Sequence, residues 1–228
     1  MKYKKICNYP IEENTYIVYD EEKKNSFIVD PFEASSVKSF LEKEGLLPDY
    51  IFLTHEHIDH IKGINEIIKQ YRCKTICSEE CSRKICDSRE NLSMYFQILL
   101  SVNSKIKISE DYISSQKPFE ANAPGDIVFD EKLQIEWCGH MIKCISTPGH
   151  TSASICILID NKMIFTGDSL IREQDTVTNL PTGSKKDYTQ KTIPIFRNLC
   201  KETIILPGHG EEFLLKEKYD FLFGEKYD

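Results

Sequence analysis

The stretch FLTHEHIDH, residues 52–60, stands at the end of an apolar run and contains three histidines and two acids within six positions. The whole chain has only six histidines, so half of them lie in this stretch. Residues 50–54 have the pattern of a buried strand, so His55 and His57 follow its end and project to the same side of an extended segment. Asp59 and His60 fall where the next helix is expected to begin. Four groups that can bind a metal therefore converge here. An alternative is that Asp59 only caps that helix and the histidines are solvated.

The same arrangement recurs at three later places in the chain. The strand-like stretches are IKCISTPGHT at 142–151, KMIFTGDS at 162–169 and ETIILPGHG at 202–210. Each apolar run ends in a turn of small residues that leads to His150, Asp168 or His209. If these strand ends share one edge of the folded sheets, seven groups face one cleft. They are His55, His57, Asp59, His60, His150, Asp168 and His209.

Seven nitrogen and oxygen ligands exceed the four that one tetrahedral site uses, which favours two metal ions. These donor types suit zinc, iron or manganese rather than a metal that selects thiolates. With two ions roughly 3.5–4 Å apart, a water between them would lose a proton near neutral pH and attack a carbonyl group. The residues therefore predict a metal-dependent hydrolase.

Four blocks in a fixed order resemble a known family. THEHIDH at 54–60, TPGHT at 147–151, TGDSL at 166–170 and PGHG at 207–210 are similar to the motifs of the metallo-β-lactamase-fold hydrolases, and among them to the small glyoxalase II-like group. Asn14 and the two strands before Pro31 also resemble the opening hairpin of that group. The resemblance covers nearly the whole chain.

The resemblance implies an α/β fold, an αββα four-layer sandwich, with the metals at the edge of the sheets. It implies that one metal is held by His55, His57 and His150. It further implies that the other is held by Asp59, His60 and His209, and that Asp168 bridges the two. Asp59 and Asp168 would then belong to the catalytic machinery. The reaction would be hydrolysis of a small thioester or ester.

The loop at 176–183 departs from the family pattern. Many small members read GRxDLPGG there, whereas this chain reads TVTNLPTG. Loss of the arginine weakens the case for an anionic substrate such as a glutathione ester. Only residues 211–228 follow Gly210, so we do not expect the helical C-terminal domain that grips glutathione. Two other functions stay open: a persulfide dioxygenase with one iron held by positions matching His55, His150 and Asp168, and a lactonase.

The composition indicates the setting of the protein. A net charge of −7 and a pI near 5.5 provide no basic surface for nucleic acid, so we expect a small-molecule substrate and no nucleic-acid partner. No apolar stretch is long enough to span a membrane, and the first residues lack the apolar core of a signal peptide. We therefore expect a cytoplasmic protein with one domain over residues 1–228. The sequence makes no prediction about the oligomeric state.

Alternating apolar runs and amphipathic stretches predict sheets covered by helices. We expect a hairpin around residues 21–25, a helix capped by Ser35 or Ser36, and one helix over 60–71. Residues 88–125 read as less regular, with Met94, Tyr95 and Phe96 either lining a pocket or forming the core of a covering segment. Short strands follow from residue 126 onward.

Nine cysteines give an odd count, and four of them crowd together without the paired spacing of a zinc ribbon. We interpret Cys73, Cys77, Cys81 and Cys86 as structural thiols of a reducing compartment. A redox switch or an iron–sulfur site is the alternative. The sixth histidine, His140, is expected in an exposed hairpin turn and receives no role.

Overall fold

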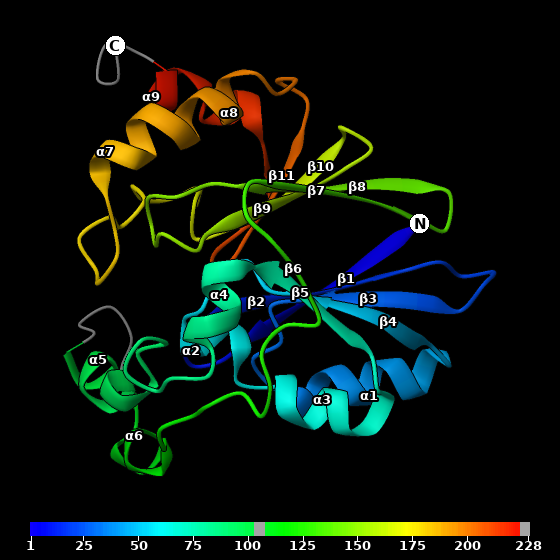
Figure 1. The fold of residues 1–228 in the computed structure, drawn as a ribbon, viewed down its shortest axis with the longest axis vertical. Coiled ribbons are helices and arrows are strands. Elements are labelled where there is room, and N and C mark those ends of the chain that lie inside the picture. Colours follow the sequence, from blue (N-terminus) through cyan, green and yellow to red (C-terminus); the bar gives the residue numbers. More distant parts are fainter. Residues whose placement is uncertain (103–107, 224–228) are drawn as a thin grey trace.

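Two six-stranded sheets form the middle of the molecule in the computed structural model, which describes residues 1–102 and 108–223 (Figure 1). The first sheet has the order β1 (Lys2–Asn8), β2 (Glu13–Tyr19), β3 (Asn25–Val29), β4 (Leu47–Phe52), β5 (Lys74–Ser78) and β6 (Ile127–Phe129). The second has the order β12 (Phe213–Leu214), β11 (Ile204–Pro207), β10 (Met163–Gly167), β9 (Ile155–Ile159), β8 (His140–Ser146) and β7 (Lys132–Trp137).

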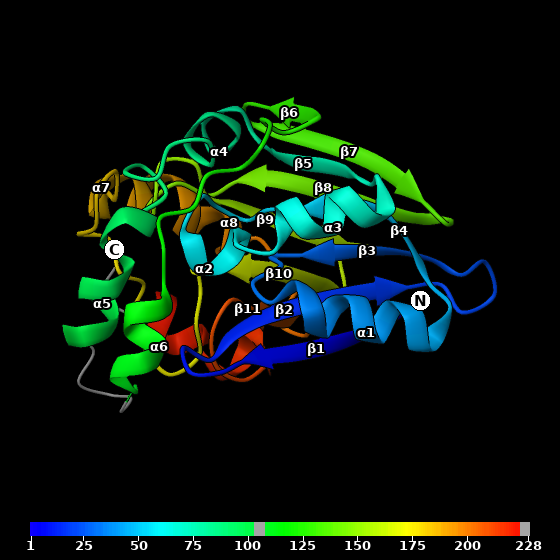
Figure 2. The ribbon, with the colours of Figure 1, turned by 90° about the horizontal axis from the view of Figure 1, so that it is seen from below.

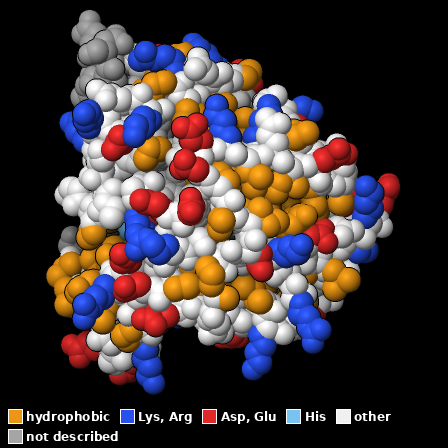
Figure 3. Space-filling model, viewed as in Figure 1, with side chains coloured by type: hydrophobic (Ala, Val, Ile, Leu, Met, Phe, Trp, Pro, Cys, Tyr) orange, Lys and Arg blue, Asp and Glu red, His pale blue; other side chains and the backbone are white. Residues whose placement is uncertain are grey.

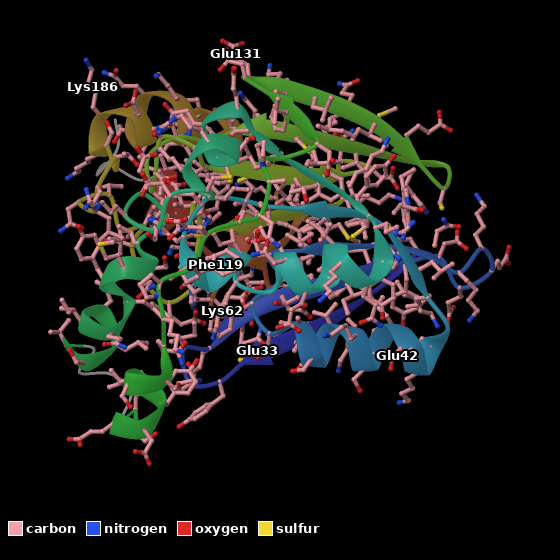
Figure 4. All side chains as sticks on the ribbon, turned by 60° about the horizontal axis from the view of Figure 1, so that its bottom comes forward. Glu33, Glu42, Lys62, Phe119, Glu131 and Lys186 are labelled. Atoms are coloured by element: carbon pink, nitrogen blue, oxygen red, sulfur yellow. The ribbon has the colours of Figure 1, made fainter. Side chains whose placement is uncertain are left out.

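Helices cover the outer face of each sheet. Over the first sheet lie α1 (Ala34–Glu44), α3 (Ile64–Tyr71) and α4 (Glu79–Lys84). At one end of the sheets lie α2 (Ile58–Ile61) and the segment of the 3₁₀ turn η1 (Ser93–Tyr95), α5 (Phe96–Val102) and α6 (Glu110–Ser115) (Figure 2). Over the second lie α7 (Lys185–Asp187), the π-turn η2 (Tyr188–Thr192), α8 (Ile193–Arg197), η3 (Leu215–Glu217) and α9 (Tyr219–Phe223). Figure 4 shows the two outer layers through Glu42 on α1 and Lys186 on α7, which point away from the molecule on opposite sides.

The alternation of side chains along each strand creates the layers. In β3, Phe27 and Val29 belong to the apolar cluster between the two sheets, while Ile28 belongs to the cluster beneath the helices. In β9, Ile157 faces the other sheet and Leu158 packs under the helices of the second sheet. Both faces of these central strands are thus buried, as a four-layer sandwich requires. The predicted αββα sandwich is confirmed.

No helix among residues 1–102 and 108–223 has both the length and the apolar character to cross a membrane.

Several predicted elements differ from the structure. The strand β1 was not predicted, because its alternation of lysines with half-buried residues resembles a solvated stretch. The predicted cap of α1 is wrong, since the helix begins at Ala34, ahead of Ser35 and Ser36, and makes no side-chain cap bond. The less regular stretch contains η1, α5 and α6, and its residues 103–107 lie outside the described residues.

The single helix predicted over 60–71 is instead two helices, α2 and α3, separated at Gly63. The Gly63 N–H donates to the carbonyl of Pro31 at 2.8 Å, and a Cβ on Gly63 would lie 2.9 Å from that oxygen. This tertiary contact breaks the helix, and Lys62 at the break forms an ion pair with Glu33 at 3.7 Å (Figure 4). Since α2 begins at Ile58, the alternative in which Asp59 caps a helix beginning near His60 is wrong; Asp59 lies in the first turn.

Candidate metal centre

Four strand ends bring the predicted site residues to one edge of the sheets. His55 and His57 follow β4, His150 precedes β9, Asp168 follows β10 and His209 follows β11. Asp59 and His60 lie on α2, which sits at the left end of both sheets in Figure 2. All seven predicted residues therefore lie together, and they form three overlapping groups whose ligand atoms are within 4.8 Å of one another.

The first group consists of three imidazole rings. His57 Nδ1 lies 3.1 Å from His55 Nε2 and 3.1 Å from His150 Nε2. Zinc–nitrogen bonds of 2.0–2.1 Å in tetrahedral geometry place neighbouring ligand nitrogens about 3.3 Å apart. The three nitrogens are therefore spaced as one metal ion would require.

The second group combines one carboxylate with two imidazoles. His209 Nε2 lies 3.4 Å from Asp59 Oδ2, and His60 Nε2 lies 3.9 Å from the same oxygen. An isolated bridge between Glu13 and His209 holds the loop after β11 against β2. Asn14 adds to this, because its side-chain amide donates to the carbonyls of Pro207 and Gly210 at 3.0 and 2.8 Å.

Asp168 presents one carboxylate oxygen to each group. Its Oδ2 lies 3.6 Å from His150 Nε2, whereas its Oδ1 lies 3.6 Å from His60 Nε2 and 3.8 Å from His209 Nε2. A carboxylate in this position can bind two ions at once.

Hydrogen bonds behind the site fix the orientation of two histidines. His60 Nδ1 donates to Asp30 Oδ2 at 3.0 Å, and His150 Nδ1 donates to the carbonyl of Val177 at 2.8 Å. When either ring is neutral, these bonds keep its proton on Nδ1, so Nε2 then carries the lone pair that faces the site. The loop at 176–183 therefore contributes to the site through its backbone.

Asp30 is a functional candidate that the sequence did not reveal. It follows β3 and is buried, and it accepts hydrogen bonds from the Thr54 N–H at 2.7 Å and from the Thr54 hydroxyl at 2.6 Å. The Thr54 hydroxyl in turn contacts His55 Nδ1 at 3.0 Å. The signal was present in the sequence, because Asp30 also follows an apolar strand, but Pro31 made the segment look like an ordinary turn.

Burial makes two histidines of the first group, His55 and His57, poor at binding protons. It lowers the pKa of His55 well below the usual value, and the neighbouring His60 adds to this effect. Burial also lowers the pKa of His57, to about 4, with His150 contributing. Both rings are thus neutral near pH 7, the form that binds a metal.

The second group differs because carboxylates surround its histidines. Burial alone would lower the pKa of His60, but Asp59 and Asp30 outweigh it and hold this pKa well above the usual value. The pKa of His209 is raised in the same way against burial, mainly by Asp168. Burial would raise the pKa of Asp59, yet the charges of His60 and His209 leave it lowered. A cation would relieve the need for protons here.

Two buried atoms support the presence of metals at this site. His60 Nε2 and Asp168 Oδ1 are buried and have no hydrogen-bond partner. Such unpaired groups are costly in a protein interior unless something else satisfies them. Both atoms point into the space shared by the two groups, so the donor set fits two divalent ions.

A buried ion pair lies behind the first group. Glu56 stands between His55 and His57 in the sequence. Its carboxylate is 3.1 Å from the ammonium of Lys84, a side chain that is only 2% exposed. Lys84 also donates to the hydroxyls of Ser152 and Thr182 at 2.7 and 3.2 Å. The ammonium of Lys84 therefore connects three segments: the turn at residues 55–57, called here the histidine turn, the loop after His150, and the loop at 176–183.

The remaining predicted features lie away from this centre. Cys73, Cys77 and Cys81 are buried thiols and Cys86 is half-buried, and all nine cysteines lie within the described residues and are free. Their structural role stays a prediction. His140 begins β8, directly after the hairpin turn, and its Nδ1 lies 2.6 Å from Asp160 Oδ2.

Of Met94, Tyr95 and Phe96, only Phe96 lines a pocket or belongs to the core, so the prediction of either role is wrong for Met94 and Tyr95. Phe96 is buried and lines the cavity over the metal centre, whereas Met94 and Tyr95 are exposed.

A histidine- and aspartate-rich centre at the edge of an αββα sandwich defines a class of metal-binding proteins, and comparison identifies the family. A model of the metallo-β-lactamase superfamily matches residues 9–209. The chain belongs to this superfamily, as its motifs predicted.

Known relatives agree with this assignment. A probable metallo-hydrolase of Methanocaldococcus jannaschii is 25% identical over 91% of this chain and 92% of its own length. A hydroxyacylglutathione hydrolase of Glaesserella parasuis is 29% identical over 72% of this chain but only 54% of its own. The crystal structure of the BLEG-1 B3 metallo-β-lactamase has a TM-score of 0.81 and 23% identity, covering 98% of this chain and all of its own, and shows the shared fold.

Proposed function

We propose that this protein is a cytoplasmic, binuclear metal-dependent hydrolase of a small thioester or ester. His55, His57 and His150 would hold one divalent ion. Asp59, His60 and His209 would hold the second, and Asp168 would bridge the two. Zinc is the metal we expect first, and iron and manganese suit the same donors. The absence of disulfides among the nine cysteines supports a reducing compartment.

The position of Asp168 is the observation that carries the proposal. A one-ion site would need only the Asp168 oxygen that lies 3.6 Å from His150, whereas the other oxygen, 3.6 Å from His60, is placed to bind a second ion. The buried and unpaired Oδ1 of Asp168 adds support, since a second ion is the partner that this atom lacks.

When bound, two such ions lower the pKa of water toward 7 and polarise a carbonyl oxygen. The side chains of the protein position the substrate and the metal-binding groups. His57, Asp59, His150, Asp168 and His209 line one cavity of about 770 Å³, so a substrate carbonyl placed there meets both groups. Asp30 and the Val177 carbonyl hold His60 and His150 with their Nε2 atoms turned inward. Asp59 and Asp168 remain ionised because histidines surround them.

Metal analysis of protein purified without added metal provides the direct test. We expect about two equivalents per chain and turnover of at least one member of a panel of thioesters, esters and lactones. One tightly held iron together with oxygen uptake on a persulfide would instead show the dioxygenase, and turnover restricted to lactones would show the lactonase.

Asp59→Ala separates the one-metal and two-metal mechanisms. In a binuclear hydrolase it removes a ligand of the second ion, so metal content should fall toward one equivalent and turnover by orders of magnitude. A mononuclear iron enzyme should keep its iron and lose only about 10- to 100-fold in activity.

Asp111→Ala is the matched control, because Asp111 is also an acid in the first turn of a short helix, α6, but does not line the cavity. Melting curves of the metal-free proteins show whether each variant folds without metal stabilisation. An Asp59→Ala protein that keeps its metals and most of its hydrolytic rate would contradict the two-metal mechanism.

A further inference from the structure

Besides the metal-binding residues, the cavity over the metal centre has one side that is apolar and an opposite side that combines apolar residues, among them Ile171 and Val177, with carboxylates. One side comes from the segment of η1 and α5 and the other from the loops that follow β1, β10 and β11. A substrate that reaches the metals must pass between them. The character of these walls therefore selects the substrate.

The side formed by η1 and α5 is apolar. Leu92, Phe96, Leu99 and Leu100 line it. Three of these side chains are buried and Leu99 is 39% exposed at the opening. Figure 3 shows further hydrophobic side chains gathered over α5, where Ile98 and Val102 are also exposed. Apolar surface of this kind binds an alkyl or aryl group in proportion to the area it covers.

The opposite side of the cavity carries acidic residues at its opening. Glu12, Glu173 and Glu211 line it, and no lysine or arginine among the described residues does. The Glu173 carboxylate is 2.7 Å from where a Cβ on Gly210 would lie, directly after His209. Lys5 pairs with Glu211 at 2.9 Å, but Glu211 remains 72% exposed.

A cation behind this opening is already engaged. Lys218 is buried and donates to the backbone carbonyls of Ile171 and Gln174, and it does not line the cavity. Its positive charge offsets part of the charge of Glu173 from behind. The described residues that line the cavity include three carboxylates at the opening and no ammonium or guanidinium group, so the field at the opening is negative. Such a field repels anionic ligands and attracts cationic ones, and salt screens it.

We infer that the substrate is an ester or thioester with an apolar group that packs against α5 and a second group, next to the acidic opening, that is uncharged or cationic. This substrate class rests on the proposed hydrolase function. It excludes anionic carriers such as glutathione as preferred leaving groups. Hydrolysis adds water across the acyl–sulfur or acyl–oxygen bond and releases a carboxylic acid and a thiol or alcohol, with no oxidant required.

Three thioesters with the same acyl group test the charge preference. We would compare kcat/KM of the metal-loaded enzyme for butyryl thiocholine (cationic), butyryl ethanethiol (neutral) and butyryl glutathione (anionic), measuring the released thiol. At low salt, kcat/KM for the cationic thioester should exceed kcat/KM for the anionic thioester by about tenfold or more, and added salt should reduce this ratio. An excess that favours the glutathione ester would overturn the inference.

Charge reversal at the opening provides the second arm. Glu12→Lys/Glu173→Lys should raise kcat/KM for the glutathione thioester and lower it for the thiocholine thioester, each taken relative to the neutral thioester with the same variant. The control is Glu22→Lys/Glu136→Lys, which makes the same change in net charge near the β2–β3 and β7–β8 hairpin turns. These turns lie at the ends of the strands that are far from the metal centre. If this control shifts the preference equally, overall charge and not the opening is responsible, and the inference fails.

The apolar wall is tested through the acyl group. Lengthening it from acetyl to hexanoyl should raise kcat/KM, and Leu99→Asn should remove most of that gain, measured as the ratio of kcat/KM for the hexanoyl thioester to kcat/KM for the acetyl thioester. Ile98→Asn is the control, since Ile98 is 62% exposed on the same helix and does not line the cavity. Turnover of none of the three thioesters would overturn both the hydrolase and the substrate class. Turnover without these preferences would overturn the substrate class alone.

Discussion

His60 donates its Nδ1 proton to Asp30 across 3.0 Å, while its Nε2 faces the site buried and without a partner. Asp30 receives two further hydrogen bonds from Thr54, at the end of the strand that carries His55. A single carboxylate behind the site thus connects a residue of each metal-binding group. Such supporting contacts hold a ring at the angle and in the tautomer that metal binding needs.

Asp30→Asn should therefore weaken metal binding without removing a ligand. The amide cannot accept from His60 as a carboxylate does, and we expect about a 10- to 100-fold loss of affinity for the second ion, measured by competition with a chromophoric chelator. Asp160→Asn is a matched control, because it alters another His–Asp pair, at His140, away from the site. Unchanged affinity in Asp30→Asn, or equal losses in both variants, would refute this role for Asp30.

Gly208→Ala tests how closely the backbone approaches the centre. A Cβ on Gly208 would lie 2.6 Å from Asp168 Oδ1 and 2.7 Å from His60 Cε1, so one of them must move. Since displacement by about 1 Å can cost 100-fold in rate, we expect a loss of that order and reduced metal content. Gly139→Ala strains a left-handed turn in the β7–β8 hairpin, so it should lower the melting temperature but keep both metals.

Proton release should distinguish the two ions. His55 and His57, whose pKa values are lowered, are already neutral near pH 7, whereas His60 and His209, whose pKa values are raised, must lose protons to bind. A metal that displaces protons binds more tightly as pH rises toward the raised pKa values. The second ion should thus weaken by about tenfold per pH unit for each proton released as pH falls, and the first much less.

Titration calorimetry in buffers of different ionisation enthalpy, between about pH 6 and pH 8, measures this release. The first equivalent should give heats that depend little on the buffer, and the second should give heats that depend on it strongly. Equal dependence for both equivalents would contradict the assignment of protons to the second group.

Much of this site could be predicted because the ends of buried strands can be recognised in the sequence. His55, His150, Asp168 and His209 each follow or precede an apolar run and a turn of small residues, and the carboxyl ends of such strands meet at one edge of the molecule. Asp30 obeys the same rule, but one acid before a proline is common in turns. Only the fold shows that its carboxylate reaches His60.

Other features depend on contacts between distant segments. The helix break at Gly63 arises from the carbonyl of Pro31, and nothing in the amphipathic pattern of residues 60–71 signals it. The acidic opening of the cavity combines Glu12, Glu173 and Glu211 from three separate loops. Lys84 is a comparable case, because a lysine on a short helix normally extends into solvent.

The burial of Lys84 leads to a prediction about stability. Its ammonium and the carboxylate of Glu56 are 2% and 1% exposed, and Lys84 neutralises the charge of Glu56 in the interior. The ammonium also pairs with the exposed Glu80 at 3.2 Å, so it is the Glu56 charge that would be isolated if the lysine were removed. Removing one partner of a buried pair typically costs about 3–5 kcal/mol, because the other charge remains buried and unpaired. We therefore expect Lys84→Met to lower the free energy of unfolding of the metal-free protein by about this amount, measured in urea.

Replacing both partners shows whether the loss of stability in Lys84→Met comes from the unpaired charge of Glu56 or from lost packing. In Lys84→Met/Glu56→Gln no isolated charge remains, and the carbonyl oxygen of the introduced amide can still accept from the Thr151 hydroxyl, which in the native protein donates to Glu56 at 2.8 Å. The double variant should therefore be more stable than Lys84→Met alone. Lys216→Met, which breaks an exposed pair with Glu202, should cost less than about 1 kcal/mol. If the double variant is no more stable than Lys84→Met, the loss comes from packing or from the bonds to Ser152 and Thr182, and the ion pair does not stabilise the histidine turn.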